Sequence, residues 1–80
     1  MNTKVNEKLQ QNVALYVIYI IEDFARKNGL TERAAFGYLN RYKGIDFIEE
    51  YYDAEHMLPM EDAMKDITMV CRQNGGGIEL

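Results

Sequence analysis

The chain has 80 residues, of which 48% are hydrophobic and 28% charged, a composition typical of one small folded domain. Its net charge of −4 disfavours bulk attraction to nucleic acid. The longest apolar run, Val13 to Ile21, is much shorter than the roughly 20 residues that cross a bilayer as a helix, so we expect no membrane span. A single cysteine and the lack of a secretory signal pattern predict a cytoplasmic protein without an internal disulfide.

A domain of this length buries only about 60% of its unfolded surface, so a protein partner or a homodimer is expected to extend its thin core. The charges along the chain are segregated. Residues 26–43 carry five basic side chains against Glu32, for a sum of +4, whereas residues 44–69 carry eight acids against Lys65, for a sum of −7. Such segregation more often serves solubility or protein partners than DNA binding.

The first predicted helix runs from about Glu7 to Lys27, because its apolar residues recur at three- and four-residue intervals: Leu9, Val13, Val17, Ile20, Ile21 and Phe24. Asn28-Gly29 ends it, since both residues tolerate the left-handed conformation found after helices. Tyr16 and Tyr19 lie off this stripe. We therefore expect a helix that is apolar on more than one side and central to the fold.

Thr31 is a natural N-cap for a second helix that ends at Lys43-Gly44, with an inward stripe of Ala35, Tyr38, Leu39 and Tyr42. Gly37 weakens this helix by about 1 kcal/mol relative to alanine unless close packing requires it. Asp46 and Glu49 have the spacing of a capping box and predict a short third helix through Tyr52, with Ile45, Ile48 and Tyr52 on its buried face.

Pro59 suits the first turn of a last helix that reaches about Gln73, with Met60, Ala63, Met64, Ile67, Val70 and Cys71 at helical spacing. Asn74 and three glycines then end it, and residues 74–80 are expected to form a flexible tail. No segment alternates as a strand does. The sequence predicts a single all-α domain over residues 1–80, with an ordered core at about 7–73, built as a small bundle of three main helices and one short one.

Enzyme chemistry is disfavoured by the side chains that are missing, and we expect no catalytic residue and no small-molecule substrate. The chain has no serine, and Cys71 falls on the buried face of the last helix, where cysteine acts as a small hydrophobe. Asp53, Glu55 and His56 are the only local acids beside an imidazole and do not make a typical zinc set, so we expect no metal. No phosphate-binding glycine loop is present, so no cofactor is expected.

The stretch from Tyr51 to His56 contains the only histidine and lies where a helical pattern breaks off. The structural interpretation is that His56 hydrogen-bonds the exposed backbone at the end of a helix and ties down a loop. The functional alternative is a protein-binding patch, because tyrosines are enriched at interfaces and acids surround them. That patch would comprise Glu49, Glu50, Tyr51, Asp53, Glu55 and His56.

A DNA-binding alternative comes from the basic second helix, which together with the following turn and third helix superficially resembles a helix-turn-helix. Its phosphate contacts would be Arg33, Arg41 and Lys43. The third helix carries acids and no Lys or Arg, so it would repel phosphates in the position of a recognition helix. Nucleic acid is therefore the less favoured partner.

The order of these segments resembles a family of small uncharacterised bacterial helical proteins. An apolar helix at Tyr16 to Phe24 is followed by a basic helix after Leu30-Thr31, a Tyr-Asp-x-x-His corner at Tyr52 to His56, and an amphipathic helix from Met60 to Val70. Members usually have leucine where this chain has Glu55. The resemblance implies a domain often encoded beside proteins that look like ADP-ribosyltransferases, as in a toxin and antitoxin pair.

Taken together, the sequence predicts a non-enzymatic protein-interaction or regulatory module. The resemblance adds that it would be the accessory or antitoxin-like partner of a neighbouring protein. A small DNA-binding transcriptional regulator that uses the basic second helix is the alternative.

Overall fold

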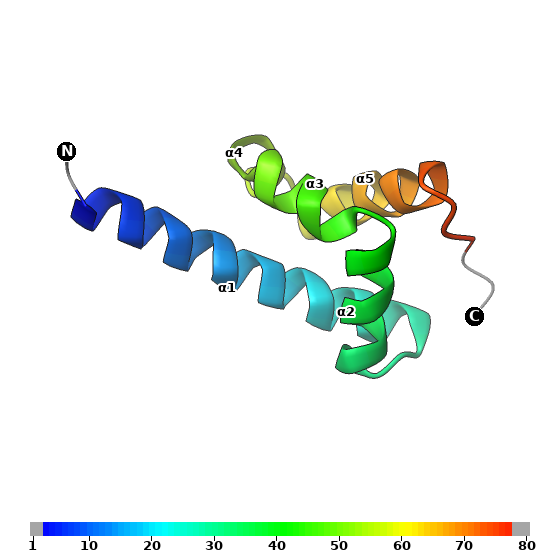
Figure 1. The fold of residues 1–80 in the computed structure, drawn as a ribbon. Helices are drawn as coiled ribbons and strands as arrows, with labels where there is room; N and C mark the ends of the chain where they lie inside the picture. Colours follow the sequence, from blue (N-terminus) through cyan, green and yellow to red (C-terminus); the bar gives the residue numbers. More distant parts are fainter. Residues whose placement is uncertain (1–2, 78–80) are drawn as a thin grey trace.

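The computed structural model describes residues 3–77, with side chains from residue 7 onward. Within those residues it contains only helices: α1 (Thr3–Asn28), α2 (Glu32–Arg41), α3 (Gly44–Glu50), α4 (Tyr52–Glu55) and α5 (Met60–Gln73) (Figure 1). The all-α prediction is confirmed, and α1, α2 and α5 are the three main helices expected. We predicted one short helix, whereas the structure has two, α3 and α4.

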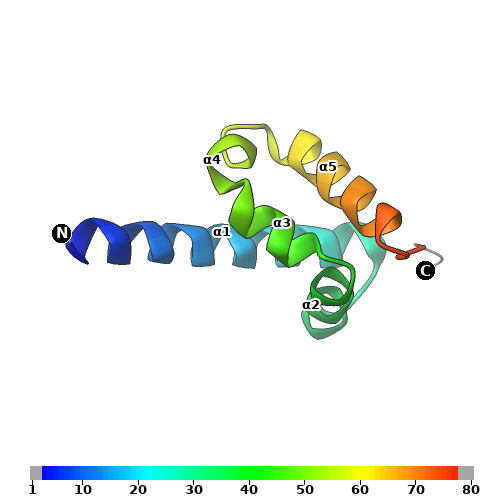
Figure 2. The same ribbon diagram turned by 45° about the horizontal axis from the view of Figure 1, so that its top comes forward.

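Helix α1 is longer than the molecule is wide. Its 26 residues span about 39 Å at 1.5 Å per residue, whereas the molecule measures 23 and 22 Å along its two shorter axes. Its N-terminal half extends beyond the other helices, and its C-terminal half lies against them (Figures 1 and 2). Only this second half is central to the fold, as the fully buried Ile20 and Phe24 and the exposed Leu9 show.

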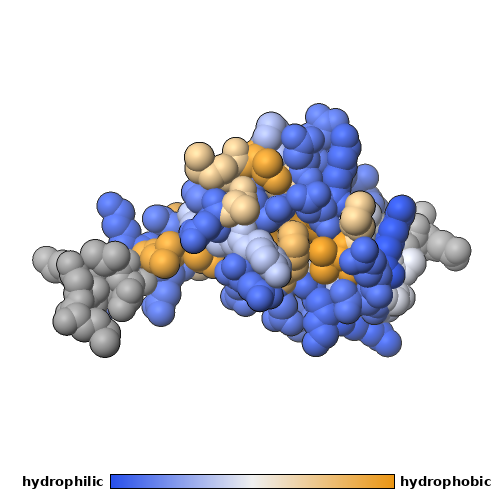
Figure 3. All heavy atoms as spheres, turned by 90° about the horizontal axis from the view of Figure 1, so that it is seen from above, coloured by the Kyte–Doolittle hydropathy of each residue, from blue (hydrophilic) through white to orange (hydrophobic). Residues whose placement is uncertain are grey.

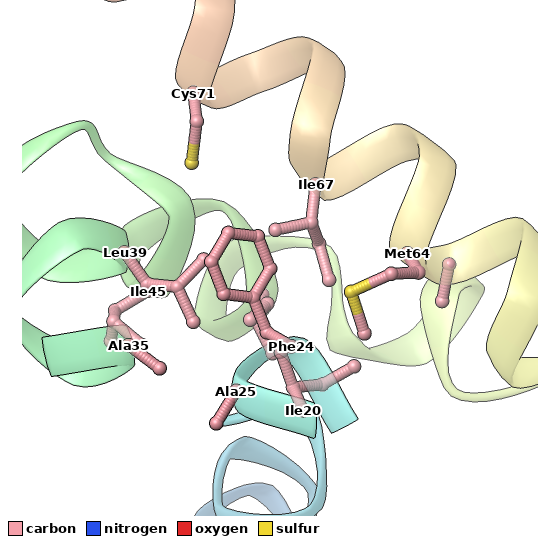
Figure 4. Close-up of a cluster of buried hydrophobic side chains, with 11 residues drawn as sticks. Ile20, Phe24, Ala25, Ala35, Leu39, Ile45, Met64, Ile67 and Cys71 are labelled. Carbon is pink, nitrogen blue, oxygen red and sulfur yellow. The ribbon is translucent and has the colours of Figure 1, made fainter. Parts of the chain in front are cut away.

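The core forms where α1, α2, α3 and α5 meet (Figure 4). Phe24 points between the residues that α2, α3 and α5 contribute, and its ring stacks on Tyr38 with 5.4 Å between centroids. The fully buried large side chains are Phe24, Ile20, Leu39, Ile48, Ile67 and Cys71. The stripe predicted for α2 therefore faces the core, with Tyr38 and Tyr42 half-buried at its edge. The stripe predicted for α5 does so as well, except for Val70, which is half-buried and outside the core cluster.

The predicted helix ends around α2 are largely confirmed. Gly29 ends α1 with a φ of 64°, and the Thr31 hydroxyl accepts a hydrogen bond of 3.1 Å from the backbone N–H of Ala34. At the other end the roles differ, because Lys43, with a φ of 70°, takes the left-handed conformation instead of Gly44. Gly44 is buried, and a Cβ there would lie 3.0 Å from both Cys71 Sγ and Leu39 Cδ2. Close packing therefore accounts for this glycine.

The predicted capping box at Asp46 is wrong. Helix α3 begins two residues earlier, at Gly44, and its N-cap residue, Lys43, makes no side-chain capping bond. The helix also ends earlier than predicted, because Tyr51 leaves helical geometry at φ −107° and ψ 24°. The chain restarts at once as α4, with the Tyr51 carbonyl accepting from the N–H groups of Ala54 and Glu55.

Residues 74–77, which follow α5, were expected to form a flexible tail, but in the structure they pack against α2. Gly76 is buried, its N–H donates to the Cys71 carbonyl at 2.8 Å, and its carbonyl accepts from the Tyr38 hydroxyl at 2.9 Å. This connection joins residues 74–77 to α2. The rest of the expected tail, residues 78–80, lies outside the described residues.

No helix in the described part of the chain is both long and apolar enough to cross a membrane.

Two glycine substitutions should have opposite effects on stability. Gly37 is exposed inside α2 with nothing within 4 Å of an added Cβ, so Gly37→Ala should raise the free energy of unfolding by about 1 kcal/mol. Gly76→Ala would place its Cβ 2.7 Å from the Tyr38 hydroxyl and 2.9 Å from the Cys71 carbonyl, and should lower it by about 1–3 kcal/mol. Urea unfolding of both variants checks the pair. Equal stabilities for Gly76→Ala and wild type would contradict the packed tail.

Candidate functional site

An aromatic corner, defined here as Tyr16, Tyr52 and His56, joins α1 to α4. The Tyr52 and His56 rings stack with 4.2 Å between centroids, and the Tyr16 ring meets Tyr52 edge-on at 5.6 Å. The Tyr16 hydroxyl donates to the Glu55 backbone carbonyl at 3.1 Å. Burial, and secondarily the Glu55 carboxyl, raises the pKa of Tyr16, so this hydroxyl keeps its proton and remains a donor at neutral pH.

A shallow hollow of about 250 Å³ lies beside this corner, lined by Asn12, Leu15, Tyr16, Tyr19, Tyr52 and His56. It brings the predicted site residue His56 next to exposed apolar residues of α1. No sequence pattern indicates that these residues are neighbours, because α1 and α4 are far apart along the chain.

His56 itself is exposed, and Nδ1 lies 2.6 Å from the Tyr52 carbonyl oxygen. Nδ1 therefore carries a proton and donates it to this carbonyl, which belongs to the first residue of α4, whereas His56 itself follows the last residue. Together with the ring stack, this is the structural role predicted from the sequence: the imidazole ties down the turn after a short helix.

The acidic residues of the predicted patch do not all share one environment. Glu49, Glu50 and Asp53 are exposed, and Tyr51 is 50% exposed while its ring packs on Phe47. Glu55, in contrast, is only 6% exposed and belongs to the interior. The prediction that Glu55 contributes to a surface patch has to be corrected, because its side chain is not available to a partner.

Glu55 meets a second acid, Asp66 of α5, in a contact that the sequence analysis missed. Burial, followed by the hydrogen bond and the charge of Asp66, raises the pKa of Glu55 to about 7. Two ionised carboxylates have no proton to share, so this hydrogen bond forms only when one of them is protonated. Oxygen Oε1 of Glu55 is buried without a hydrogen-bond partner.

Cys71 has the environment of a structural cysteine. It is completely buried, and burial raises the pKa of its thiol to about 11, although a hydrogen bond from the Gly44 backbone acts in the opposite direction. At neutral pH the thiol is therefore protonated and shielded, which removes its nucleophilic form. In the part of the chain that the structure describes, no three or more His, Cys, Asp or Glu side chains are grouped to hold a metal ion.

The basic residues of the DNA-binding alternative are all exposed. Arg33 and Arg41 lie on α2, Lys43 lies in the following turn, and the Arg41 guanidinium sits 5.5 Å from the centre of the Tyr42 ring. Helix α3, which follows this turn, exposes Asp46, Glu49 and Glu50. DNA binding through α2 stays a prediction.

His56→Ala should lower the free energy of unfolding by about 1 kcal/mol, because the variant loses the hydrogen bond to the Tyr52 carbonyl and the ring stack on Tyr52. For a domain of this size the melting temperature should fall by roughly 4–8 °C. Differential scanning calorimetry measures both quantities. An unchanged melting temperature would mean that the imidazole does not tie down the turn and would favour a functional role.

Glu55→Gln should change how stability depends on pH. The pKa of Glu55 is raised from 4.5 to about 7 in the folded state, so between these pH values the folded protein binds a proton that the unfolded chain has released. This contribution is fully present below about pH 4.5 and is lost as pH rises through about 7. Glutamine keeps a donor for Asp66 at every pH. The melting temperature of the variant minus that of wild type should therefore increase from about pH 5 to pH 8, and a constant difference would contradict the shared proton.

Comparison with curated proteins and with solved structures found no match. Comparison with known families found one described as "Protein of unknown function (DUF3791)", which matches residues 15–74. The match begins in α1 and ends just after α5, so it includes the aromatic corner, the Glu55–Asp66 pair and the whole core. Because it covers three quarters of the chain, this protein belongs to the DUF3791 family.

Proposed function

We propose that this chain is a non-enzymatic interaction module that binds a basic surface of a partner protein through an acidic corner, defined as Glu49, Glu50, Tyr51 and Asp53. The observation that supports it is the combination of three exposed carboxylates with a half-exposed tyrosine where α3 passes into α4. Among the described side chains, both salt bridges involve Asp23 of α1, so no cation of the described residues forms a salt bridge with the corner.

The geometry suits recognition because the aromatic anchor is held in place before binding. Tyr51 packs on Phe47 with 5.2 Å between ring centroids, and its backbone N–H donates to the Phe47 carbonyl at 2.9 Å. A tyrosine fixed in this way loses little conformational entropy on binding, and tyrosines often contribute a large share of interface affinity. The carboxylates around it would accelerate association with a basic partner and make it sensitive to salt.

The exposed surface next to the corner adds apolar area. Met57 and Leu58, in the turn between α4 and α5, are both exposed. Orange and tan spheres mark apolar residues near this end of the molecule, with blue polar residues around them (Figure 3). An apolar centre with charged surroundings is the usual composition of a protein interface.

The partner that the family resemblance implies is an ADP-ribosyltransferase-like protein encoded by a neighbouring gene. In this proposal the module would be its antitoxin-like accessory, with the acidic corner occupying a basic cleft of the enzyme. The sequence of the neighbouring gene product supplies the first check, because the proposal requires a basic surface on it.

Binding should depend on the acidic corner and not on acidic charge in general. Tyr51→Ala should weaken binding to the co-expressed neighbour by about tenfold or more, and Glu50→Gln with Asp53→Asn should slow association, most strongly at low salt. Surface plasmon resonance measures both rates. The control is Glu7→Gln with Glu32→Gln, which makes the same change in charge at exposed positions of α1 and α2. Equal losses in the control and in the corner variants would contradict the proposed site.

A further inference from the structure

The outer face of α1, turned away from the core, carries three large apolar side chains that nothing in the structure covers. Leu15, Ile18 and Tyr19 are 50%, 48% and 55% exposed. Their spacing of three and four residues places them side by side on one face of the helix, on the side opposite the buried Ile20 and Phe24. A helix that is apolar on both sides is normally buried on both sides.

This apolar face has ends of opposite charge. Lys8 lies seven residues before Leu15 and Glu22 lies seven residues after it, so all three project from nearly the same side of α1. Both charged side chains are exposed. Along the helix, this face therefore begins with a positive charge at Lys8, continues with apolar residues and ends with a negative charge at Glu22.

The surface around the second half of this face is also acidic. A hollow of about 620 Å³ is lined by Tyr19, Glu22, Asp23, Ala25, Arg26, Glu32 and Met60, and it shares Tyr19 with the hollow at the aromatic corner. Three of its residues are acids and one is a base, and that base, Arg26, already forms an ion pair with Asp23. A segment that binds to this face of α1 and its acidic hollow should therefore be apolar and carry a positive charge.

We propose that this segment is the N-terminal half of α1 from a second copy of the chain. In an antiparallel pair about a two-fold axis near Leu15, each Lys8 lies beside Glu22 of the other copy, and the Leu15, Ile18 and Tyr19 side chains meet in the middle. A parallel pair would instead bring Lys8 to Lys8 and Glu22 to Glu22. The charge pattern therefore selects the antiparallel arrangement, which is isologous and closes on itself as a dimer.

The area of this contact predicts a weak dimer. Each of the three apolar side chains exposes on the order of 100 Å², so two copies bury about 600 Å² of apolar surface through them alone. The stems of Lys8, Gln11, Asn12 and Glu22 bring the total close to the roughly 1,000 Å² that a specific interface requires. A dissociation constant on the order of 10 µM is expected, so the species present depends on protein concentration.

Sedimentation velocity from about 1 µM to about 1 mM should show a shift from monomer to dimer. Leu15→Glu should abolish the dimer at the highest concentration while circular dichroism shows the same helix content, because this side chain is half exposed in the monomer. The control is Phe36→Glu, an equally exposed apolar residue on α2, which should keep the wild-type behaviour. A monomer at every concentration, or a dimer that Leu15→Glu leaves intact, overturns the proposal.

The orientation of the two helices can be tested by exchanging charges. Lys8→Glu and Glu22→Lys should each weaken the dimer by about tenfold at low salt, and the double variant should restore it, because each pair again has opposite charges. In a parallel dimer the double variant would restore nothing, and that result contradicts the proposal. None of these residues belongs to the acidic corner, so partner binding can fail while dimerisation holds, or the reverse.

Disulfide trapping gives a second measure of the same geometry. Lys8→Cys mixed with Glu22→Cys should give a crosslinked heterodimer under mild oxidation, whereas each variant alone should not crosslink. The native Cys71 does not interfere, since it is completely buried. Crosslinking of Lys8→Cys with itself would indicate parallel helices and overturn the proposed arrangement.

Discussion

The stack of Phe24 on Tyr38 is the contact on which the packing of this small domain depends. Phe24 is fully buried in α1, and the core around it contains Ile48 of α3 and Ile67 of α5. Tyr38 extends the same contact outward, because its hydroxyl holds the carbonyl of Gly76. One pair of rings therefore connects α1, α2 and the end of the chain. Truncation of a buried phenylalanine typically costs about 3–5 kcal/mol, a large share of the stability of a domain of this size.

Two acids occupy this thin core, and they are accommodated in different ways. Asp23 is met within its own helix by Arg26, and by Lys27 with 3.4 Å between Nζ and Oδ2. Glu55 lies beside another acid, Asp66, and burial together with this neighbour raises its pKa to about 7. The first solution stabilises one helix locally. The second favours the neutral, protonated form of Glu55.

The features that could be predicted from the sequence are those that neighbouring residues determine. The hydrophobic period gave the main helices, and Gly29 and Thr31 marked helix ends because their conformational and capping preferences are local. Apart from the capping box and the end of α3, the errors involve contacts between distant segments. Gly44 is required by its closeness to Cys71, and Glu55 is buried against Asp66, but no short-range pattern indicates either contact. In the candidate site, the hydrogen bond of His56 could be predicted from the chemistry of imidazole. The residues of α1 that line the hollow beside it could be identified only from the structure.

The projection of α1 beyond the body also implies a gradient of local stability along a single helix. From residue 7 to residue 12 every side chain is exposed, so this stretch gains almost nothing from tertiary packing. Isolated helices shorter than about 12–15 residues are marginal in water, and the first turns of α1 are therefore helical mainly because they continue a helix that is anchored further along. Backbone amides should exchange with solvent deuterium rapidly at the start of α1 and become steadily more protected toward Phe24. The local free energy of unfolding is therefore expected to rise along α1 toward Phe24, although the helix is continuous.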